Sequence, residues 1–326
     1  MPDHRLPRDV LPRHYDLEMR PDLEGGTFSG SVSIHVEVIH GASRIVLNSM
    51  GLSVGRATIT DSTGPRRLDV EADVDNECIA LSPEGGTRSG TAIIELDFTG
   101  SFDDRLRGFY RSTLTNSDGT TDSIATTQFQ STDARRAFPC FDEPDMKATF
   151  AISLVAPEGL LAISNGAELS RAPLGDGTDR VVFEETIPLS TYLVAFVVGP
   201  LEATDPVDVD GTPVRVIHPP GKGHLTSFAL EVAAHSLRWF QEWYDIDVPG
   251  GKVDLVALPD FAFGAMENLG CITFREILLL VDPGSATQAE LERVAAVLSH
   301  ELAHLWFGDL VTMEWWNGIW LNEAFA

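Results

Sequence analysis

Two histidines four residues apart, His300 and His304, enclose a glutamate at Glu301, and this short motif constrains the chain more than any other feature. Residues spaced by four lie on the same face of an α-helix, so both imidazoles can reach a single ion. Glu301 projects beside them, where its carboxylate can take a proton from a water held at that ion. The motif therefore predicts a metal centre that carries its own general base.

A third candidate ligand, Glu323, follows His304 after the eighteen residues 305–322. Two imidazoles and one carboxylate form a ligand set that is typical of zinc. Three protein ligands leave the fourth zinc position open, and an open position indicates a catalytic site rather than a structural one. We therefore expect one zinc ion per chain.

The sequence around the motif predicts a helix over residues 287–307. Thr287 and Glu290 have the spacing of a capping box, and Gly308 is a plausible C-terminal stop. Apolar residues recur at helical spacing: Leu291, Val294, Leu298, Leu302 and Leu305. The alternative is a chance motif in a packing helix. The His-Glu-His residues lie off the centre of the apolar stripe, however, and a buried polar cluster without a metal is costly.

The rest of the chain divides into two patterns. Residues 1–203 contain runs of alternating apolar residues, such as 28–38 and 92–98, separated by Gly, Asp, Ser and Pro. This pattern predicts an N-terminal all-β domain, built as an antiparallel sheet or sandwich. Residues 204–326 instead mix predicted strands with long helices, which indicates an α+β domain. Its expected elements before the metal helix are strands at 214–218 and 252–258 and a helix at 223–243.

The charge balance narrows the range of partners. The chain has 23 basic and 49 acidic residues, a net charge of −26. Such a surface repels nucleic acid and anionic membranes, so neither is an expected partner. It could attract cationic peptide ends, although solubility is the simpler explanation. The sequence does not define the oligomeric state.

The cysteines and the N-terminus indicate a cytoplasmic protein. Cys78, Cys140 and Cys271 are few and widely spaced, which suggests reduced thiols. The first 23 residues are charged and broken by prolines, without the apolar core of a signal peptide, and no run of eighteen apolar residues follows. The seven other histidines have no paired ligand spacing and are interpreted as surface or packing residues.

A second segment narrows the functional class. Gly264-Ala265-Met266-Glu267-Asn268 lies 36 residues before His300 and follows a strand-like run. With the histidine motif and the later glutamate, it resembles the zinc aminopeptidases of the aminopeptidase N and leukotriene hydrolase group. Four further segments are similar to that family, so the resemblance covers nearly the whole chain: residues 6–17, 128–144, 190–199 and 311–316. It implies that residues 204–326 begin a thermolysin-like zinc-peptidase domain.

The resemblance also implies roles for individual residues. His300, His304 and Glu323 would hold the zinc, and Glu301 would activate the water that attacks the peptide bond. The substrate would be a peptide with a free N-terminus.

Substrate recognition would fall to the pentapeptide. Glu267 would anchor the positively charged α-amine, because a charge-assisted hydrogen bond is strong in a partly desolvated cleft. The backbone of Gly264 and Ala265 would pair with the extended substrate, and Met266 and Asn268 complete this substrate-binding segment. Taken in isolation, the same five residues favour a simple loop after a strand.

Gln130 departs from the commoner family pattern, in which a glutamate gives the amine a second carboxylate partner. A glutamine at this position resembles the leukotriene hydrolase branch of the family. Its side-chain carbonyl oxygen can accept a hydrogen bond from the amine but supplies no charge. We therefore expect amine recognition to depend mainly on Glu267. Gln128, two residues earlier, is either a lining residue of the first side-chain pocket or a solvent-facing strand residue.

The resemblance further implies that the chain is an N-terminal fragment, since family members continue beyond the position of Ala326 with an oxyanion-stabilising tyrosine and a helical domain. Such a fragment is expected to have little or no activity. The leading interpretation is a zinc aminopeptidase. The alternatives are a zinc hydrolase of other specificity, either an endopeptidase or an epoxide hydrolase, and a non-catalytic binding module on the same scaffold.

Overall fold

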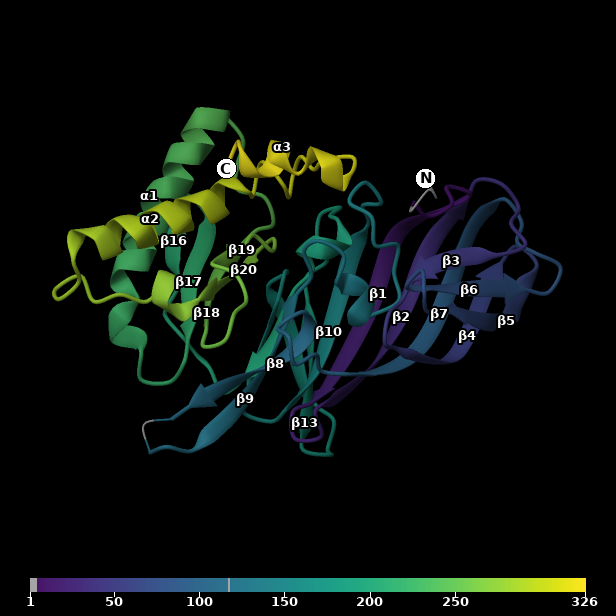
Figure 1. Ribbon diagram of the computed structural model, residues 1–326, viewed down its shortest axis with the longest axis horizontal. Coiled ribbons are helices and arrows are strands. Elements are labelled where there is room, and N and C mark those ends of the chain that lie inside the picture. Colours follow the sequence, from purple (N-terminus) through teal and green to yellow (C-terminus); the bar gives the residue numbers. More distant parts are fainter. Residues whose placement is uncertain (1–4, 117) are drawn as a thin grey trace.

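The computed structural model describes residues 5–116 and 118–326, which form three β-sheets and a set of helices (Figure 1). The largest sheet has ten strands. Nine neighbouring pairs make up this sheet, and all are antiparallel except β1 with β10, which is parallel. In spatial order the strands are β12 (Glu168–Pro173), β13 (Thr178–Phe183), β10 (Thr149–Pro157), β1 (Val10–Asp22), β2 (Thr27–Val38), β7 (Gly90–Ser101), β4 (Ser53–Asp61), β5 (Gly64–Asp73), β6 (Cys78–Pro83) and β3 (Ile45–Asn48).

The two alternating runs that predict strands lie at the centre of this sheet. They are β2 and β7, which pair along their whole length with Ile34 opposite Ile94. Both of these side chains are fully buried, and the residues between the buried positions are more exposed, as period-two patterning requires. The predicted N-terminal β domain is therefore confirmed.

A second, antiparallel sheet lies beside the first and is more deeply buried. Its strands are, in spatial order, β11 (Leu161–Ser164), β14 (Phe196–Gly199), β9 (Thr121–Gln128) and β8 (Gly108–Thr115). Every residue of β14 is buried, and Phe196 packs edge-to-face against Phe109 of β8 with ring centroids 5.1 Å apart. Within this sheet, β9 ends at Gln128, two residues before Gln130.

The third sheet and the long helices form the α+β part. Its strands are, in spatial order, β15 (Glu202–Ala203), β17 (Thr212–His218), β18 (Val253–Leu258), β20 (Cys271–Arg275) and β19 (Ala265–Met266), with β16 (Val207–Val209) also paired to β17. Two helices, α1 (Ser227–Tyr244) and α2 (Gln288–Ala303), contact each other beside this sheet, at the opposite end of the molecule from β4, β5 and β6 (Figure 1). The short helix α3 (Trp320–Glu323) follows near the C-terminus.

The predicted strands of this part are confirmed, but the helices begin or end differently. The helix predicted over 223–243 begins at Ser227, because residues 223–225 form a 3₁₀ turn. The metal helix has the predicted capping box at Thr287 but ends at Ala303, four residues before the predicted end. After His304 the backbone hydrogen bonds depart from the α-helical spacing of four residues. Trp306 N bonds to Ala303 O, three residues back, and Asp309 N bonds to His304 O, five residues back, at 3.1 Å. Gly308 is therefore part of a turn and not the helix stop.

The predicted domain boundary near residue 203 coincides with a change of sheet. β15, at residues 202–203, pairs with β17 and so already belongs to the third sheet. The division into domains at 203 stays a prediction. Within the described residues, none of the helices has both the length and the apolar composition needed to cross a bilayer.

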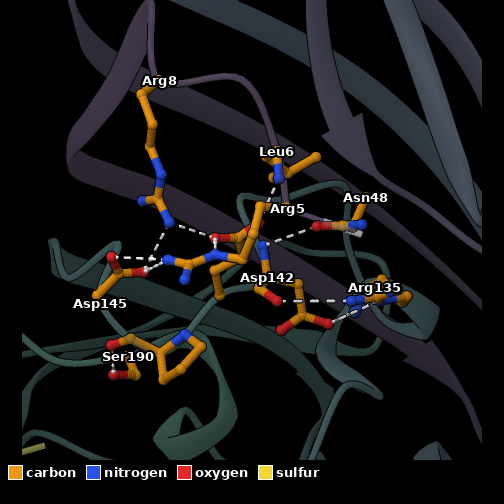
Figure 2. Close-up of polar contacts among 10 residues, drawn as sticks. Arg5, Leu6, Arg8, Asn48, Arg135, Asp142, Asp145 and Ser190 are labelled. Atoms are coloured by element: carbon orange, nitrogen blue, oxygen red, sulfur yellow. Dashed lines mark hydrogen bonds and ion pairs between the residues drawn. The ribbon is translucent and has the colours of Figure 1, made fainter. Parts of the chain in front are cut away.

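A turn at residues 142–145 anchors the N-terminal segment by ion pairs (Figure 2). Glu143 is buried and accepts hydrogen bonds from Arg5 Nε at 2.7 Å and Arg8 Nη2 at 2.6 Å, as well as from the backbone N–H of Leu6. Asp145 also pairs with both arginines. Ion pairs and hydrogen bonds of this kind offset the cost of burying the Glu143 carboxylate, which accounts for the acidic turn at residues 142–145.

Candidate metal and peptide site

Helix α2 brings the two motif histidines together at its C-terminal end. His300 Nε2 lies 3.1 Å from His304 Nε2, and the two rings meet edge-to-face. His304 is 1% exposed, whereas the side chain of His300 is 36% exposed, so the pair lies at the boundary between the core and an open cavity. This is the arrangement that the four-residue spacing predicts.

Helix α3 brings Glu323 to the same point. Its Oε2 atom lies 3.4 Å from His300 Nε2 and 3.8 Å from His304 Nε2. Tetrahedral zinc with bonds of about 2.0–2.2 Å separates its ligand atoms by roughly 3.3–3.6 Å, so the three atoms fit one ion. The hydrogen bond with His300 lowers the pKa of Glu323 despite its partial burial, which keeps the carboxylate in the ionised form that binds a metal.

The ring of His304 is held by a backbone contact. Its Nδ1 atom lies 2.9 Å from the carbonyl oxygen of Phe307. A carbonyl can only accept, so Nδ1 carries the proton and Nε2 presents a lone pair toward His300 and Glu323. Such a second contact orients a metal-binding histidine and fixes its tautomer.

A second group of side chains, Glu267, Glu301 and His304, also has its ligand atoms within 4.8 Å of one another. It shares His304 with the first group but has two carboxylates and only one nitrogen. The first group has two nitrogens and one carboxylate, which is a common catalytic zinc set. We therefore take His300, His304 and Glu323 as the candidate ligands, which leaves Glu267 and Glu301 free for other roles.

Glu301 lies on the buried side of α2, only 6% exposed. Burial raises the pKa of its carboxyl well above the usual range, and the nearby carboxylates of Glu267 and Glu323 add to the effect. A carboxylate with a raised pKa holds a proton more strongly, which suits a general base next to a metal.

The pentapeptide 264–268 contains the short edge strand β19, Ala265–Met266. β19 pairs with β20 on one side only and is the last strand of its sheet. Gly264, Ala265 and Glu267 line a cavity of about 540 Å³, whereas Met266 and Asn268 are buried and absent from its lining. Three of the five residues of the pentapeptide therefore face the cavity.

Glu267 is the buried carboxylate of this cavity. It is 3% exposed, and burial raises the pKa of its carboxyl above the usual value. Gln130 Nε2 lies 3.5 Å from Glu267 Oε1, so in this structure the Gln130 amide donates toward the carboxylate. The acceptor role predicted for Gln130 needs its other amide atom to face the ligand, and that role stays a prediction.

Gln128 is the last residue of β9, and Gln130 lies in the turn that follows. Gln128 is 2% exposed and its Nε2 lies 3.5 Å from Met266 Sδ. The solvent-facing alternative for Gln128 is therefore wrong, because β9 is covered by Met266 and paired on both sides. Gln128 does not line the cavity, and its predicted place at a first side-chain pocket remains untested.

Three further residues line the cavity and carried no sequence signal: Phe263, Ala296 and Val297. Ala296 and Val297 precede His300 by one turn of α2, so helical spacing could have found them. Asp309 is another residue that the motifs did not indicate. It is fully buried behind the site, and neither carboxylate oxygen has a hydrogen-bond partner among the residues that the structure describes. Burial raises the pKa of this carboxyl well above the usual range.

Comparison with known proteins agrees with this architecture. The model of the peptidase M1 N-terminal domain matches residues 11–193, and that of the peptidase family M1 domain matches residues 228–326. These matches define the class as peptidases in which a β domain precedes an α+β peptidase domain. The chain belongs to the peptidase M1 family.

Several curated relatives match along almost the whole chain. Aminopeptidase M1-C of Oryza sativa subsp. japonica is 42% identical, and puromycin-sensitive aminopeptidase of Caenorhabditis elegans is 41% identical, each over 99% of this chain. The alanine/arginine aminopeptidase of Saccharomyces cerevisiae is 40% identical over 98% of it. The chain spans 36%, 34% and 38% of the length of these three relatives, or about a third.

Proposed function

We propose that this chain carries the metal-binding and amine-binding centre of a zinc-dependent aminopeptidase, which removes N-terminal residues from peptides. The observation that carries the proposal is the convergence of His300, His304 and Glu323 in one cavity with the buried carboxylates of Glu301 and Glu267. The names of the relatives, which are aminopeptidases, support the same conclusion.

In this proposal Glu267 sets the register of the substrate. A peptide α-amine is positively charged, and a buried carboxylate binds it more strongly than one in open water. The free edge of β19, at Gly264 and Ala265, offers backbone groups to which an extended peptide can add as a further strand. With its amine held at Glu267, the first peptide bond lies over the histidine pair, which excludes cleavage farther along the chain.

The chemistry divides between the metal and Glu301. When bound, zinc polarises the scissile carbonyl and lowers the pKa of the attacking water. Glu301 takes the proton from that water and delivers it to the leaving amine, so one carboxylate acts first as base and then as acid. Its burial favours this role, because a proton shuttle in a dry site is not in competition with solvent.

Two further features belong to the proposal. The three cysteines are free in the structure, which is compatible with a cytoplasmic location. The net charge of −26 favours peptide substrates over nucleic acids as partners.

The test of the function compares a peptide that has a free N-terminus with its N-acetylated form. The test uses the full-length enzyme, because the chain alone is expected to have little or no activity. We expect the full-length enzyme to cleave the free peptide with a much larger kcat/KM, to lose this activity to a zinc chelator, and to regain it with zinc. Equal cleavage of both peptides would replace the aminopeptidase with an endopeptidase. If the protein cleaves neither peptide but opens an epoxide substrate, the epoxide hydrolase interpretation would be favoured.

Replacement of any proposed ligand is expected to remove most of the bound zinc. His300→Ala, His304→Ala and Glu323→Ala each leave only two protein ligands, and two ligands do not hold zinc against dilution. Elemental analysis of the purified variants measures this, with His235→Ala on α1 as a control outside the site. Undiminished zinc in one ligand variant would remove that residue from the set.

A further inference from the structure

Two segments that the family resemblance singles out, 128–144 and 190–199, meet behind the candidate site. Thr191 Oγ1 donates to Asp142 Oδ1 at 2.7 Å, and Ser190 Oγ donates to the carbonyl of Pro144. Asp142 is itself fixed by Arg135 Nε at 2.9 Å and by the side chain of Asn48, which accepts from its backbone N–H (Figure 2). The 3₁₀ turn Thr191–Leu193 is therefore held firmly against the β domain.

From this turn Tyr192 reaches across to the part that carries the metal ligands. Its hydroxyl accepts a hydrogen bond from Asn322 Nδ2 at 2.9 Å and lies 3.4 Å from the carbonyl oxygen of Gly308, to which it donates. Its ring packs edge-to-face on Trp316, with centroids 5.3 Å apart. Burial raises the pKa of Tyr192 well above the usual value, so the phenol keeps the proton that it donates.

Both hydrogen-bond partners of Tyr192 adjoin a candidate ligand. Asn322 is the residue before Glu323 and is itself 1% exposed. Gly308 has φ +138°, and a Cβ atom there would lie 3.3 Å from His304 Nδ1 and 3.4 Å from Asn322 Nδ2. The backbone at Gly308 is thus packed between the His304 ring and Asn322, with no room for a side chain. Its carbonyl also accepts from Thr312 Oγ1, so this turn has a second support.

This contact bears on the site because the ligands come from two separate helices. His300 lies in the last turn of helix α2 and His304 is its C-cap residue. Glu323 is the last residue of α3, which has only four residues, and the side chain of Glu323 is 46% exposed. A helix of one turn has little stability of its own, so its position must come from tertiary contacts. The Tyr192 hydroxyl contacts both the turn that follows α2, at Gly308, and the residue before Glu323, Asn322.

We propose that Tyr192 is a positioning residue for the metal centre: its hydroxyl bridges Asn322 and Gly308 and thereby fixes Glu323 relative to His304. The inference rests on the proposed function in that it takes these side chains to bind zinc. In this proposal segment 190–199 of the β domain positions the candidate zinc ligands through Tyr192, although the β domain contains none of these ligands.

The test is Tyr192→Phe, which keeps the ring and its packing on Trp316 but removes the hydroxyl. We expect the zinc dissociation constant to rise about tenfold, the lower end of the range for residues that support metal ligands. Competition with a chelator measures the constant on the purified protein. The melting temperature of the zinc-free form measures stability separately.

The matched control is Tyr15→Phe. Tyr15 is also fully buried, and its hydroxyl accepts a hydrogen bond from the backbone N–H of Phe141 at 3.1 Å, within the β domain. Both variants lose one buried hydroxyl, which has two hydrogen bonds in Tyr192 and one in Tyr15, so losses of stability of the same order are expected. Only Tyr192→Phe is expected to weaken zinc binding. An equal loss of zinc affinity in both variants would mean that general destabilisation is responsible, and the inference would be wrong.

A double-mutant cycle tests the route of the effect. If Tyr192 acts through Asn322, the protein with Tyr192→Phe and Asn322→Ala together binds zinc about as weakly as the weaker single variant. Effects that simply multiply, or a Tyr192→Phe protein that binds zinc as tightly as the unaltered one, would overturn the inference. If the unaltered protein takes up no zinc at all, the proposed function fails first, and this inference falls with it.

Discussion

Glu301→Gln is expected to lower kcat by about 10²–10⁴-fold while leaving zinc bound, because general-base assistance contributes an effect of that size. Glutamine keeps the shape of the side chain and its capacity to hydrogen bond, but it cannot accept a proton from the attacking water. The site of the change is buried and borders the candidate ligands without belonging to them. Its effect should therefore appear in the chemical step and not in metal binding.

The matched control lies on the same helix. Glu292→Gln makes the same chemical change on the exposed face of α2, where Glu292 accepts a hydrogen bond from Gln288. Steady-state kinetics and zinc analysis of both variants separate the two positions. Activity of Glu301→Gln within a few-fold of the unaltered protein would show that another group is the base. Loss of zinc from Glu301→Gln would instead point to the second group of side chains, with Glu267 and His304, as the ligand set.

The sequence could predict that these side chains come together because their geometry is mostly local. His300 and Glu301 lie in the last turn of α2 and His304 is its C-cap, so helical spacing alone determines which of them share a face. The capping box at Thr287 was equally readable, since both of its residues lie within one turn. The end of the same helix could not be predicted locally, because contacts with other segments shape the turn at 304–311. One of them is the hydrogen bond that Lys147 Nζ donates to the carbonyl oxygen of Asp309 at 2.8 Å.

The β domain illustrates the same limit at a larger scale. Alternation in residues 28–38 predicted a strand with one buried face, and β2 has it. No local pattern predicts that β1 pairs with β10 in parallel, or that ten strands form one sheet. Likewise, nothing near Tyr192 in the sequence indicates Asn322, 130 residues away, as its partner. Long-range contacts of this kind depend on the whole chain, so family resemblance could mark segment 190–199 without explaining it.

The second large effect concerns recognition of the charged amine by Glu267. Glu267→Ala is expected to lower kcat/KM for a peptide with a free N-terminus by about ten- to a hundred-fold. The reason is that a hydrogen bond to a charged group contributes roughly 1.5–3 kcal/mol. Part of the loss should appear in kcat, because the amine contact also sets the distance between the first peptide bond and the metal. An N-acetylated peptide has no charged amine, so its slow cleavage should change little.

Gln130 makes this prediction sharper. Its amide nitrogen lies 3.5 Å from Glu267 Oε1, so a carboxylate introduced by Gln130→Glu would face the same space as Glu267. In the Gln130→Glu single variant, which keeps Glu267, the two carboxylates would repel each other until an amine bound between them. In the Glu267→Ala background there is no such repulsion, and Gln130→Glu should restore a large part of the lost kcat/KM. Kinetics on free and acetylated peptides for the four proteins measure both effects. If Glu267→Ala slows the two peptides equally, Glu267 supports the fold of the cavity and does not read the amine.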